Sequence, residues 1–355
     1  MEKGVEVGYG RDVCGESLRM RARQATNSVQ DSTLVLGAFT PLQYNQRVPE
    51  IITPPIDGST RFCAVYGHPV RHSASPAMHN AALAELGLPW RYLAFDVHPD
   101  SLKEALAGAR AVKFVGLNLT VPHKLLALDM MDVLDDSARR WGAVNTVRFE
   151  GRRGENWIPL ASMEPGEPTE LRAHGFNTDA DAIARSLRED LGLEIRGAKI
   201  LILGAGGAGR VAALKLASEG AAELFLVNRT RQKLDELREI LRVQFPAVRV
   251  TLGFPAGKVD LLLNATSLGL SAEDPSPLAD GDFALDRAGA VYDMIYRPAE
   301  TALLRRARAA GCRGANGLGM LLYQGARALE IWSGRTAPVA VMRSALQHTL
   351  YGERV

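Results

Sequence analysis

The chain has 355 residues, of which 46% are hydrophobic and 23% are charged, the composition of a globular protein long enough for two domains. Its 42 basic and 40 acidic residues leave a net charge of +2 without a basic block, so neither nucleic acid nor a membrane surface is expected as the main partner. No apolar run reaches the roughly 18 residues of a membrane span, and the polar first segment lacks the apolar core of a secretory signal.

The cysteines and the first segment carry little functional signal. Cys14, Cys63 and Cys312 are widely spaced and match no metal-ligand pattern, which predicts reduced thiols, a cytoplasmic location and no bound metal. Residues 1–60 are polar and then contain several prolines. We interpret them as an extension, either a flexible arm or the remnant of an upstream domain.

From Arg61 onward, apolar runs alternate with helical patterns. Ser75 and Pro76 mark a helix start, because a serine hydroxyl can cap a helix and proline is tolerated in its first turn. The polar segment 151–174 is expected to be a loop or an extended hairpin. The alternation predicts βαβ units and a largely parallel sheet. Strands are expected at 62–69, 90–97, 113–121 and 143–148, and helices from Ser75, at 101–109 and after Pro122.

A glycine-rich turn follows an apolar run in the second half of the chain. Residues 200–203 are typical of a buried strand, and a helical pattern rich in alanine and leucine follows the glycines. The spacing G-x-G-x-x-G at such a junction can hold a dinucleotide pyrophosphate against the helix N-terminal amides. The alternative is a tight turn without a ligand. The candidate loop comprises Gly204, Ala205, Gly206, Gly207, Ala208 and Gly209.

The remaining elements of the second half also alternate, which favours a doubly wound sheet. A helix at 181–192 precedes the glycine turn. The expected strands after it are 223–229, 249–252, 260–267 and 289–296, and the expected helices are 231–245, 301–311, 319–334 and 337–352.

The residues after the second strand of this unit indicate which dinucleotide binds. A site that prefers NAD usually places an acid there to accept from the ribose 2′-hydroxyl. This chain has Asn228 and Arg229 instead, and Arg229 with Arg231 or Lys233 could contact a 2′-phosphate. The pattern favours NADP, and the alternative is that these charges are solvated residues at a helix start.

The candidates for proton transfer lie mainly upstream of the glycine turn. In NLTVPHK, Asn118, Thr120 and Lys124 lie at or just past the carboxyl end of an apolar strand, where open α/β sheets bind ligands. In GFNTDAD, Asn177 and Asp179 lie at the boundary between the two units. A lysine near a carboxylate can be held in position to transfer a proton. Taken singly, Lys124 could be a surface lysine and Asp179 a helix N-cap.

An ordered set of motifs resembles shikimate dehydrogenases and covers residues 62 to about 340. The motifs are GHPVRHSASPAMHN, NLTVPHK, GAVNTV, GFNTD, ILGAGGAGRVAALKL, NRT, NATSLGL, YDMIYRP and NGLGMLLYQGARALEIWSG. The resemblance implies NADPH-dependent, reversible reduction of 3-dehydroshikimate to shikimate in aromatic amino acid biosynthesis. The alternatives are an NAD-dependent quinate or shikimate dehydrogenase of catabolism, and a catalytically silent metabolite sensor on the same fold.

The resemblance also implies roles for individual residues. Lys124 and Asp179 would form the catalytic pair. The residues implied to bind substrate are Ser73, Ser75, Thr120, Asn145, Asp179, Tyr296 and Gln324. Those implied to bind the cofactor, besides the glycine loop, are Asn228, Arg229, Thr230, Lys233, Thr266, Ser267, Met294 and Gly317.

We therefore expect a two-domain α/β protein with its active site in the cleft between the domains. Residues 61–180 with 317–355 would form a substrate domain with a mostly parallel sheet, and residues 181–316 a Rossmann-like NADP domain. The expected partners are a small-molecule substrate and NADP(H), with the chain a monomer or homodimer. Ala74 stands where many members of the resembled family carry lysine, and ADAI follows NTD in place of a glycine-containing run.

Overall fold

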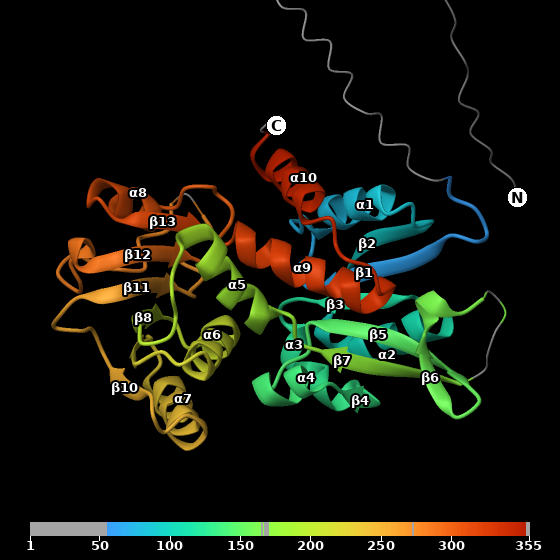
Figure 1. Ribbon diagram of the computed structural model, residues 1–355, viewed down its shortest axis with the longest axis horizontal. Helices are drawn as coiled ribbons and strands as arrows, with labels where there is room; N and C mark the ends of the chain where they lie inside the picture. The colour runs from blue at the N-terminus through green and yellow to red at the C-terminus, as the bar shows by residue number, and fades with distance from the viewer. Residues whose placement is uncertain (1–54, 165, 167–169, 272, 353–355) are drawn as a thin grey trace, which may run out of the picture. The chain divides into compact units, whose positions relative to one another are not determined.

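The computed structural model describes residues 55–352 except 165, 167–169 and 272. In this part of the chain the strands form two sheets flanked by helices (Figure 1). The first strand begins at Arg61. The extension expected at residues 1–60 therefore falls almost entirely outside the described residues.

The first sheet has the strand order β2-β1-β3-β5-β7-β4, with β6 paired to β5. β1 is parallel to β2 and to β3, whereas β5 runs antiparallel to β3, β6 and β7. The described residues of the segment 151–174 include the end of β5, all of β6 and the start of β7, in line with the predicted extended hairpin. The strands are β1 (Arg61–Gly67), β2 (Trp90–Asp96), β3 (Gly116–Leu119), β4 (Val133–Leu134), β5 (Thr146–Arg153), β6 (Asn156–Pro159) and β7 (Leu171–Phe176).

Four helices connect these strands. Ser75 is the first residue of α1, no side chain caps the helix, and a proline stands in its first turn. The predicted cap by the Ser75 hydroxyl is therefore wrong, because Ser75 lies inside the helix and the N-cap position is held by Ala74. The helices are α1 (Ser75–Glu85), α2 (Leu102–Ala111), α3 (His123–Leu126) and α4 (Asp136–Trp141).

The second sheet is parallel throughout, with the order β10-β9-β8-β11-β12-β13. Counted along the unit, this order is 3-2-1-4-5-6, that of a doubly wound dinucleotide-binding domain. Its strands are β8 (Lys199–Leu203), β9 (Glu223–Val227), β10 (Arg249–Leu252), β11 (Val259–Asn264), β12 (Ala288–Asp293) and β13 (Arg313–Asn316). The helices are α5 (Asp179–Leu191), α6 (Gly207–Ser218), α7 (Arg231–Gln244), α8 (Ala302–Ala309), α9 (Leu318–Ser333) and α10 (Val339–Tyr351).

Helices α5 and α9 pack side by side between the two sheets (Figure 1). From there the chain returns to the first sheet, because α10 packs against α1 and Trp332 of α9 donates to the carbonyl oxygen of Val147 on β5 at 2.9 Å. Trp141, at the end of α4, makes a contact from the first sheet to the second. It is buried among residues of α5, α6 and β8. These contacts hold the carboxyl ends of β3 and of the second sheet near one another.

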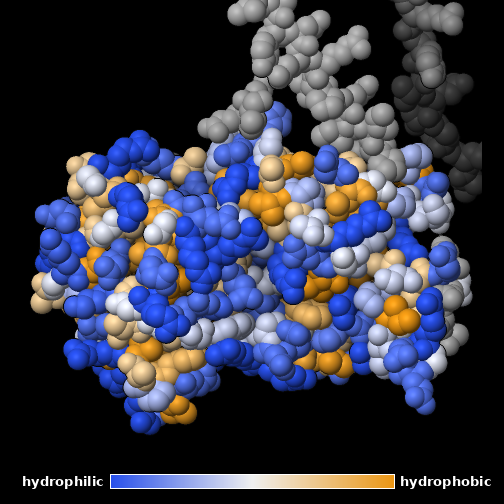
Figure 2. All heavy atoms as spheres, viewed as in Figure 1, coloured by the Kyte–Doolittle hydropathy of each residue, from blue (hydrophilic) through white to orange (hydrophobic). Residues whose placement is uncertain are grey.

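The surface in view is mostly hydrophilic, with apolar residues scattered among charged ones (Figure 2). Among the described residues, no helix has the length and apolar character needed to cross a membrane.

Candidate active site

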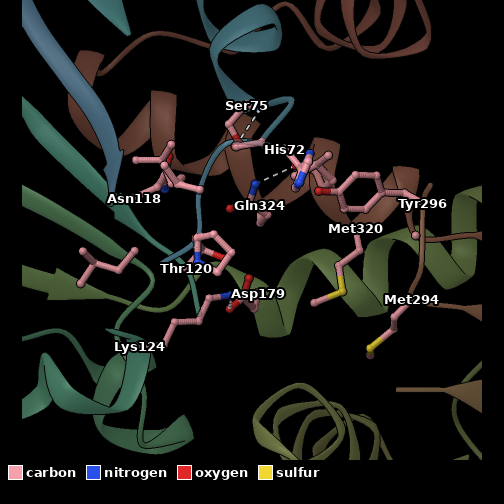
Figure 3. Close-up of a pocket in the computed structure, with 17 residues that line it drawn as sticks. His72, Ser75, Asn118, Thr120, Lys124, Asp179, Met294, Tyr296, Met320 and Gln324 are labelled. Carbon is pink, nitrogen blue, oxygen red and sulfur yellow. Dashed lines mark hydrogen bonds and ion pairs between the residues drawn. The ribbon is translucent and has the colours of Figure 1, made fainter. Parts of the chain in front are cut away.

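A cavity of about 280 Å³ opens where the ends of the two sheets meet (Figure 3). Its walls come from the turn before α1, the carboxyl end of β3, the first residue of α5, the loops after β12 and β13, and the first turns of α9. The lining residues are Val65, Pro69, Val70, His72, Ser73, Ser75, Asn118, Leu119, Thr120, Lys124, Asp179, Met294, Tyr296, Gly317, Met320, Leu321 and Gln324. Most of the residues predicted to contact substrate are therefore brought together.

Lys124 and Asp179 form an ion pair on one wall of this cavity, with Nζ 2.8 Å from Oδ2. The Asp179 side chain is 9% exposed and that of Lys124 is 32% exposed, so the pair is half-shielded from solvent while the amine still faces the cavity. Asp179 is the first residue of α5, where the helix dipole favours a carboxylate. The pair can hold an amine in place beside a bound ligand.

Thr178 stands at the N-cap position of α5, and the side chain that binds the first amides of the helix is that of Asn177, not that of Asp179. Asn177 Oδ1 accepts the backbone amides of Asp179 at 3.1 Å and Ala180 at 3.2 Å, while its Nδ2 donates to the Ala143 carbonyl oxygen at 3.0 Å. The alternative that Asp179 serves as the N-cap is therefore excluded by the geometry. The Asp179 carboxylate is therefore free of the helix amides and pairs with Lys124.

The wall across from the ion pair offers hydroxyl and amide groups (Figure 3). Ser73 and Ser75 lie in the turn that leads into α1, with the Ser75 amide donating to the Ser73 hydroxyl at 3.3 Å. Gln324 extends from α9, and its Nε2 donates to the Leu321 carbonyl oxygen at 2.8 Å. Tyr296 closes this side, and burial raises the pKa of its phenol. Such groups suit a small polyhydroxylated acid.

Two asparagines predicted from the motifs occupy different places. Asn118 lines the cavity, and its Oδ1 accepts the buried Tyr92 hydroxyl at 2.8 Å. Asn145 is 1% exposed, does not line the cavity, and is held by Thr178, whose amide donates to its Oδ1 at 2.8 Å. The structure therefore brings Asn118, and not Asn145, to the cavity wall.

Seven lining residues carried no predicted role, and two of them, His72 and Met320, have long side chains at the cavity wall. His72 lies in the turn before α1, beside Ser73. Met320 lies one helical turn before Gln324 on α9, so the helical period alone could have placed both on one face.

The glycine loop has the shape that a pyrophosphate requires. Gly204 has φ of +105°, which favours glycine, and a Cβ on Gly209 would lie 2.1 Å from the Gly204 carbonyl oxygen. A Cβ on Gly206 or Gly207 would meet no atom within 4 Å, so this side of the loop is open. No side chain caps α6, whose first amides are free to bind an anion. A dinucleotide fits here.

The segment after β9 lies beside this loop. Asn228 Oδ1 accepts the Ala205 amide at 3.0 Å, which ties the end of β9 to the glycine turn. Arg229 and Lys233 are exposed and form no ion pair within the described residues, whereas Arg231 pairs with Asp235 at 3.2 Å. Two cations are therefore available for a phosphate.

Four more predicted cofactor residues lie beside the glycine loop or in the cavity wall. Thr266 donates through its hydroxyl to Asn264 at 2.8 Å, beside exposed Ser267, and the Thr266 loop abuts Gly204. Met294 and Gly317 line the cavity itself. A Cβ on Gly317 would lie 2.0 Å from the Met294 carbonyl oxygen, so this approach requires glycine.

Comparisons with known proteins cover most of the chain. Three family models match: the shikimate dehydrogenase substrate binding domain at residues 65–147, shikimate / quinate 5-dehydrogenase at 185–267, and the shikimate 5′-dehydrogenase C-terminal domain at 317–347. The chain is 43% identical over 302 residues to the shikimate dehydrogenase (NADP(+)) of Methanopyrus kandleri, covering 82% of this chain and 97% of that protein.

Solved structures match the same family over most of the chain. The crystal structure of shikimate 5-dehydrogenase from Thermus thermophilus in complex with NADP(H) and shikimate has a TM-score of 0.68 and 38% identity, covering 82% of this chain and all of that one. The 5-ketofructose reductase of a Gluconobacter strain has the same TM-score, 32% identity and the same coverage. With these matches, the chain belongs to the shikimate dehydrogenase family.

Proposed function

We propose that the protein is an NADP-dependent shikimate dehydrogenase, which interconverts 3-dehydroshikimate and shikimate for aromatic amino acid biosynthesis. The observation that carries the proposal is the Lys124–Asp179 ion pair, placed in a hydroxyl- and amide-lined cavity at the ends of both sheets. Family membership supports it, as does the NADP(H) and shikimate complex of the Thermus thermophilus relative. A pocket built of directional donors and acceptors can select one small polyhydroxylated acid.

Substrate binding follows from the chemistry of the walls. We assign the carboxylate to the hydroxyls of Ser73 and Ser75, with Thr120 and Tyr296 nearby, and the ring hydroxyls to Asp179 and Gln324. Asn145 could contact a ring hydroxyl only by exchanging its bonds with Thr178. We also place Asn118 beside the substrate ring, although the motif alone gave this residue no role in substrate binding.

Lys124 performs the proton transfer in this proposal. Its Nζ donates a proton to the reacting oxygen during reduction and recovers it during oxidation, while Asp179 keeps the amine oriented. NADPH, when bound, supplies the hydride that reduces the carbonyl carbon. The Asp179 carboxylate is largely buried, so the pair lies partly out of water, which strengthens the interaction of the amine with a developing alkoxide.

The cofactor would lie along the second sheet. We assign the pyrophosphate to residues 204–209 and the 2′-phosphate to Arg229 and Lys233, with Asn228 and Thr230 beside them. Thr266, Ser267, Met294 and Gly317 would surround the nicotinamide. We also propose that residues 61–180 with 317–355 act as the substrate domain and 181–316 as the NADP domain, in a cytoplasmic monomer or homodimer.

Steady-state kinetics of the purified chain test this function. Shikimate, quinate and 5-ketofructose are each assayed with NADP and with NAD. The proposal expects the highest kcat/KM for shikimate with NADP, and it expects Arg229→Ala to raise the KM for NADP without a matching rise for NAD. A preference for NAD, or for either other substrate, would overturn it.

A further inference from the structure

We propose that Tyr351, the last residue of α10, is a positioning residue for the substrate cavity. Its hydroxyl would hold the loop that carries Tyr296, so that the Tyr296 phenol stays at the cavity wall. The role in turnover rests on the proposed function.

Tyr351 joins two loops through one hydroxyl group. The hydroxyl donates to the backbone carbonyl oxygen of Tyr296 at 2.7 Å and accepts from Asn316 Nδ2 at 3.0 Å. Tyr296 follows β12 and Asn316 ends β13, so the tyrosine contacts the carboxyl ends of two neighbouring strands of the second sheet.

These two loops are also joined to each other. Asn316 Nδ2 donates to the Ala299 carbonyl oxygen at 2.8 Å, and the Gly317 amide donates to the Ile295 carbonyl oxygen at 3.1 Å. Together they supply Met294, Tyr296 and Gly317 to the cavity. A group that holds one loop therefore holds a continuous part of the cavity wall, which we call the β12–β13 wall (residues 294–299 and 316–317).

A second cavity adjoins the β12–β13 wall. It has a volume of about 390 Å³ and is lined by Ala299, Asn316, Leu318 and Tyr351 among others. Tyr296 and Tyr351 both pack against the buried cluster around α1 and α9, and the hydrogen bonds of the Tyr351 hydroxyl add a directional restraint to that packing.

The helix that carries Tyr351 also supports the opposite side of the substrate cavity. α10 packs against α1, whose first residue is Ser75. Tyr351 thus connects the β12–β13 wall to the helices behind Ser73 and Ser75. It sets the separation between the phenol of Tyr296 and the hydroxyls that we assign to the substrate carboxylate.

The alternative is that Tyr351 merely ends α10, beside Gly352 with φ of +69° at the helix C-terminus. A structural end group would affect unfolding but not the affinity for one ligand. The two interpretations predict different effects of removing the Tyr351 hydroxyl. The positioning role predicts changes in the KM for shikimate and in the hydrogen exchange of the amides at 294–299, whereas a structural end group changes neither.

The test uses the full chain and the variant Tyr351→Phe, which removes only the hydroxyl. Loss of the two hydrogen bonds that this hydroxyl makes predicts a rise of about three- to tenfold in the KM for shikimate, a smaller rise in the KM for NADP, whose nicotinamide we place against Met294 and Gly317 of the same wall, and a kcat nearly unchanged. The matched control is Tyr323→Phe on α9, whose hydroxyl accepts from Arg343 at 2.7 Å and lines no part of the substrate cavity. It should leave the KM for shikimate unchanged.

The variant Tyr296→Phe provides the coupling test. If Tyr351 acts through the Tyr296 phenol, adding Tyr351→Phe to Tyr296→Phe should raise the KM for shikimate much less than it does in the wild type. Three results would each overturn the proposal: an unchanged KM for shikimate in Tyr351→Phe, an additive effect of the two substitutions in the double variant, or a rise in the KM for NADP equal to that for shikimate.

Hydrogen exchange followed by mass spectrometry separates this proposal from the proposed function. Tyr351→Phe should speed exchange of the amides at 294–299 relative to Tyr323→Phe, whatever the substrate. Unchanged exchange of these amides in Tyr351→Phe would contradict the positioning role. Absence of shikimate turnover in the wild type, with faster exchange in Tyr351→Phe, would contradict the function and keep the positioning of the wall.

Discussion

The Asn177 side chain accepts the backbone amide of Asp179 at 3.1 Å, and this bond leaves the Asp179 carboxylate to pair with Lys124. The asparagine also donates to the Ala143 carbonyl oxygen at 3.0 Å, which fixes the start of α5 against the segment before β5. One side chain thus both binds the first amides of the helix and determines where the ion pair lies.

Replacing Asn177 with alanine should therefore lower both stability and turnover. The lost cap costs about 1 kcal/mol of unfolding free energy. The freed helix start would also let Asp179 turn toward its own amides and away from Lys124, so kcat should fall. Urea unfolding and steady-state kinetics measure the two effects. Asn177→Asp keeps the acceptor for the two amides but loses the donor to the Ala143 carbonyl oxygen, so it should retain more activity than Asn177→Ala, and equal activity of the two variants would contradict the capping explanation.

Lys124→Ala tests the proton transfer. Removal of a general acid or base lowers kcat by about 10² to 10⁴. The KM for shikimate should change less, because Ser73 and Ser75 remain. Exposed Lys103 on α2 gives the matched control, and Lys103→Ala should behave like the wild type. Near-normal turnover by purified Lys124→Ala would remove the role we give this lysine.

The glycine loop predicts a contrast between two alanine variants. In Gly209→Ala the new Cβ would lie 2.1 Å from the Gly204 carbonyl oxygen, so the loop must shift at a cost of about 1–3 kcal/mol. In Gly207→Ala the Cβ meets nothing within 4 Å, and stability without cofactor should be unchanged. A cofactor lying over the open side would still be hindered, so the KM for NADP should rise. Thermal unfolding and cofactor titration check the pair, and equal stability loss would be inconsistent with the loop geometry.

His79 predicts a pH dependence of stability. The ring is 0% exposed, its nitrogens have no hydrogen-bond partner, and it stacks on Tyr92 at 4.1 Å. Burial lowers the pKa of His79 from 6.5 to about 3. As the pH falls below 6.5, the unfolded chain takes up a proton that the folded chain does not, so stability is lost down to about pH 3.

His79→Phe keeps the ring and removes the titrating group. Between about pH 7 and about pH 5, the wild type should lose about 2 kcal/mol more unfolding free energy than the variant. Urea unfolding at both pH values measures the difference. The same loss in both proteins would show that His79 does not carry this dependence.

Local patterns in the sequence predicted the elements that position the chemistry. The strand, glycine turn and helix at 199–216 are β8, the loop and α6, because buried apolar runs and glycine spacing are local signals. Lys124 and Asp179, which the resemblance implied as a pair, lie 2.8 Å apart. Only Lys124 was placed from a strand end, where such sheets bind ligands, whereas Asp179 was placed at the boundary between the two units.

Features that depend on packing between distant segments could not be predicted in this way. β13 has the sequence RGAN, too short to show alternation, and forms by pairing with β12. The antiparallel direction of β5 places Asn145 behind the cavity and leaves Asn118 at its wall. The position of Tyr351 against Tyr296 depends on α10 folding back over α1.

Product formation by the purified chain with shikimate and NADP shows directly whether this cavity carries out the reaction. 3-Dehydroshikimate and NADPH should appear in equal amounts, and Lys124→Ala should slow both by the same factor. No reduction of NADP by shikimate, or reduction without 3-dehydroshikimate, would contradict the proposed function.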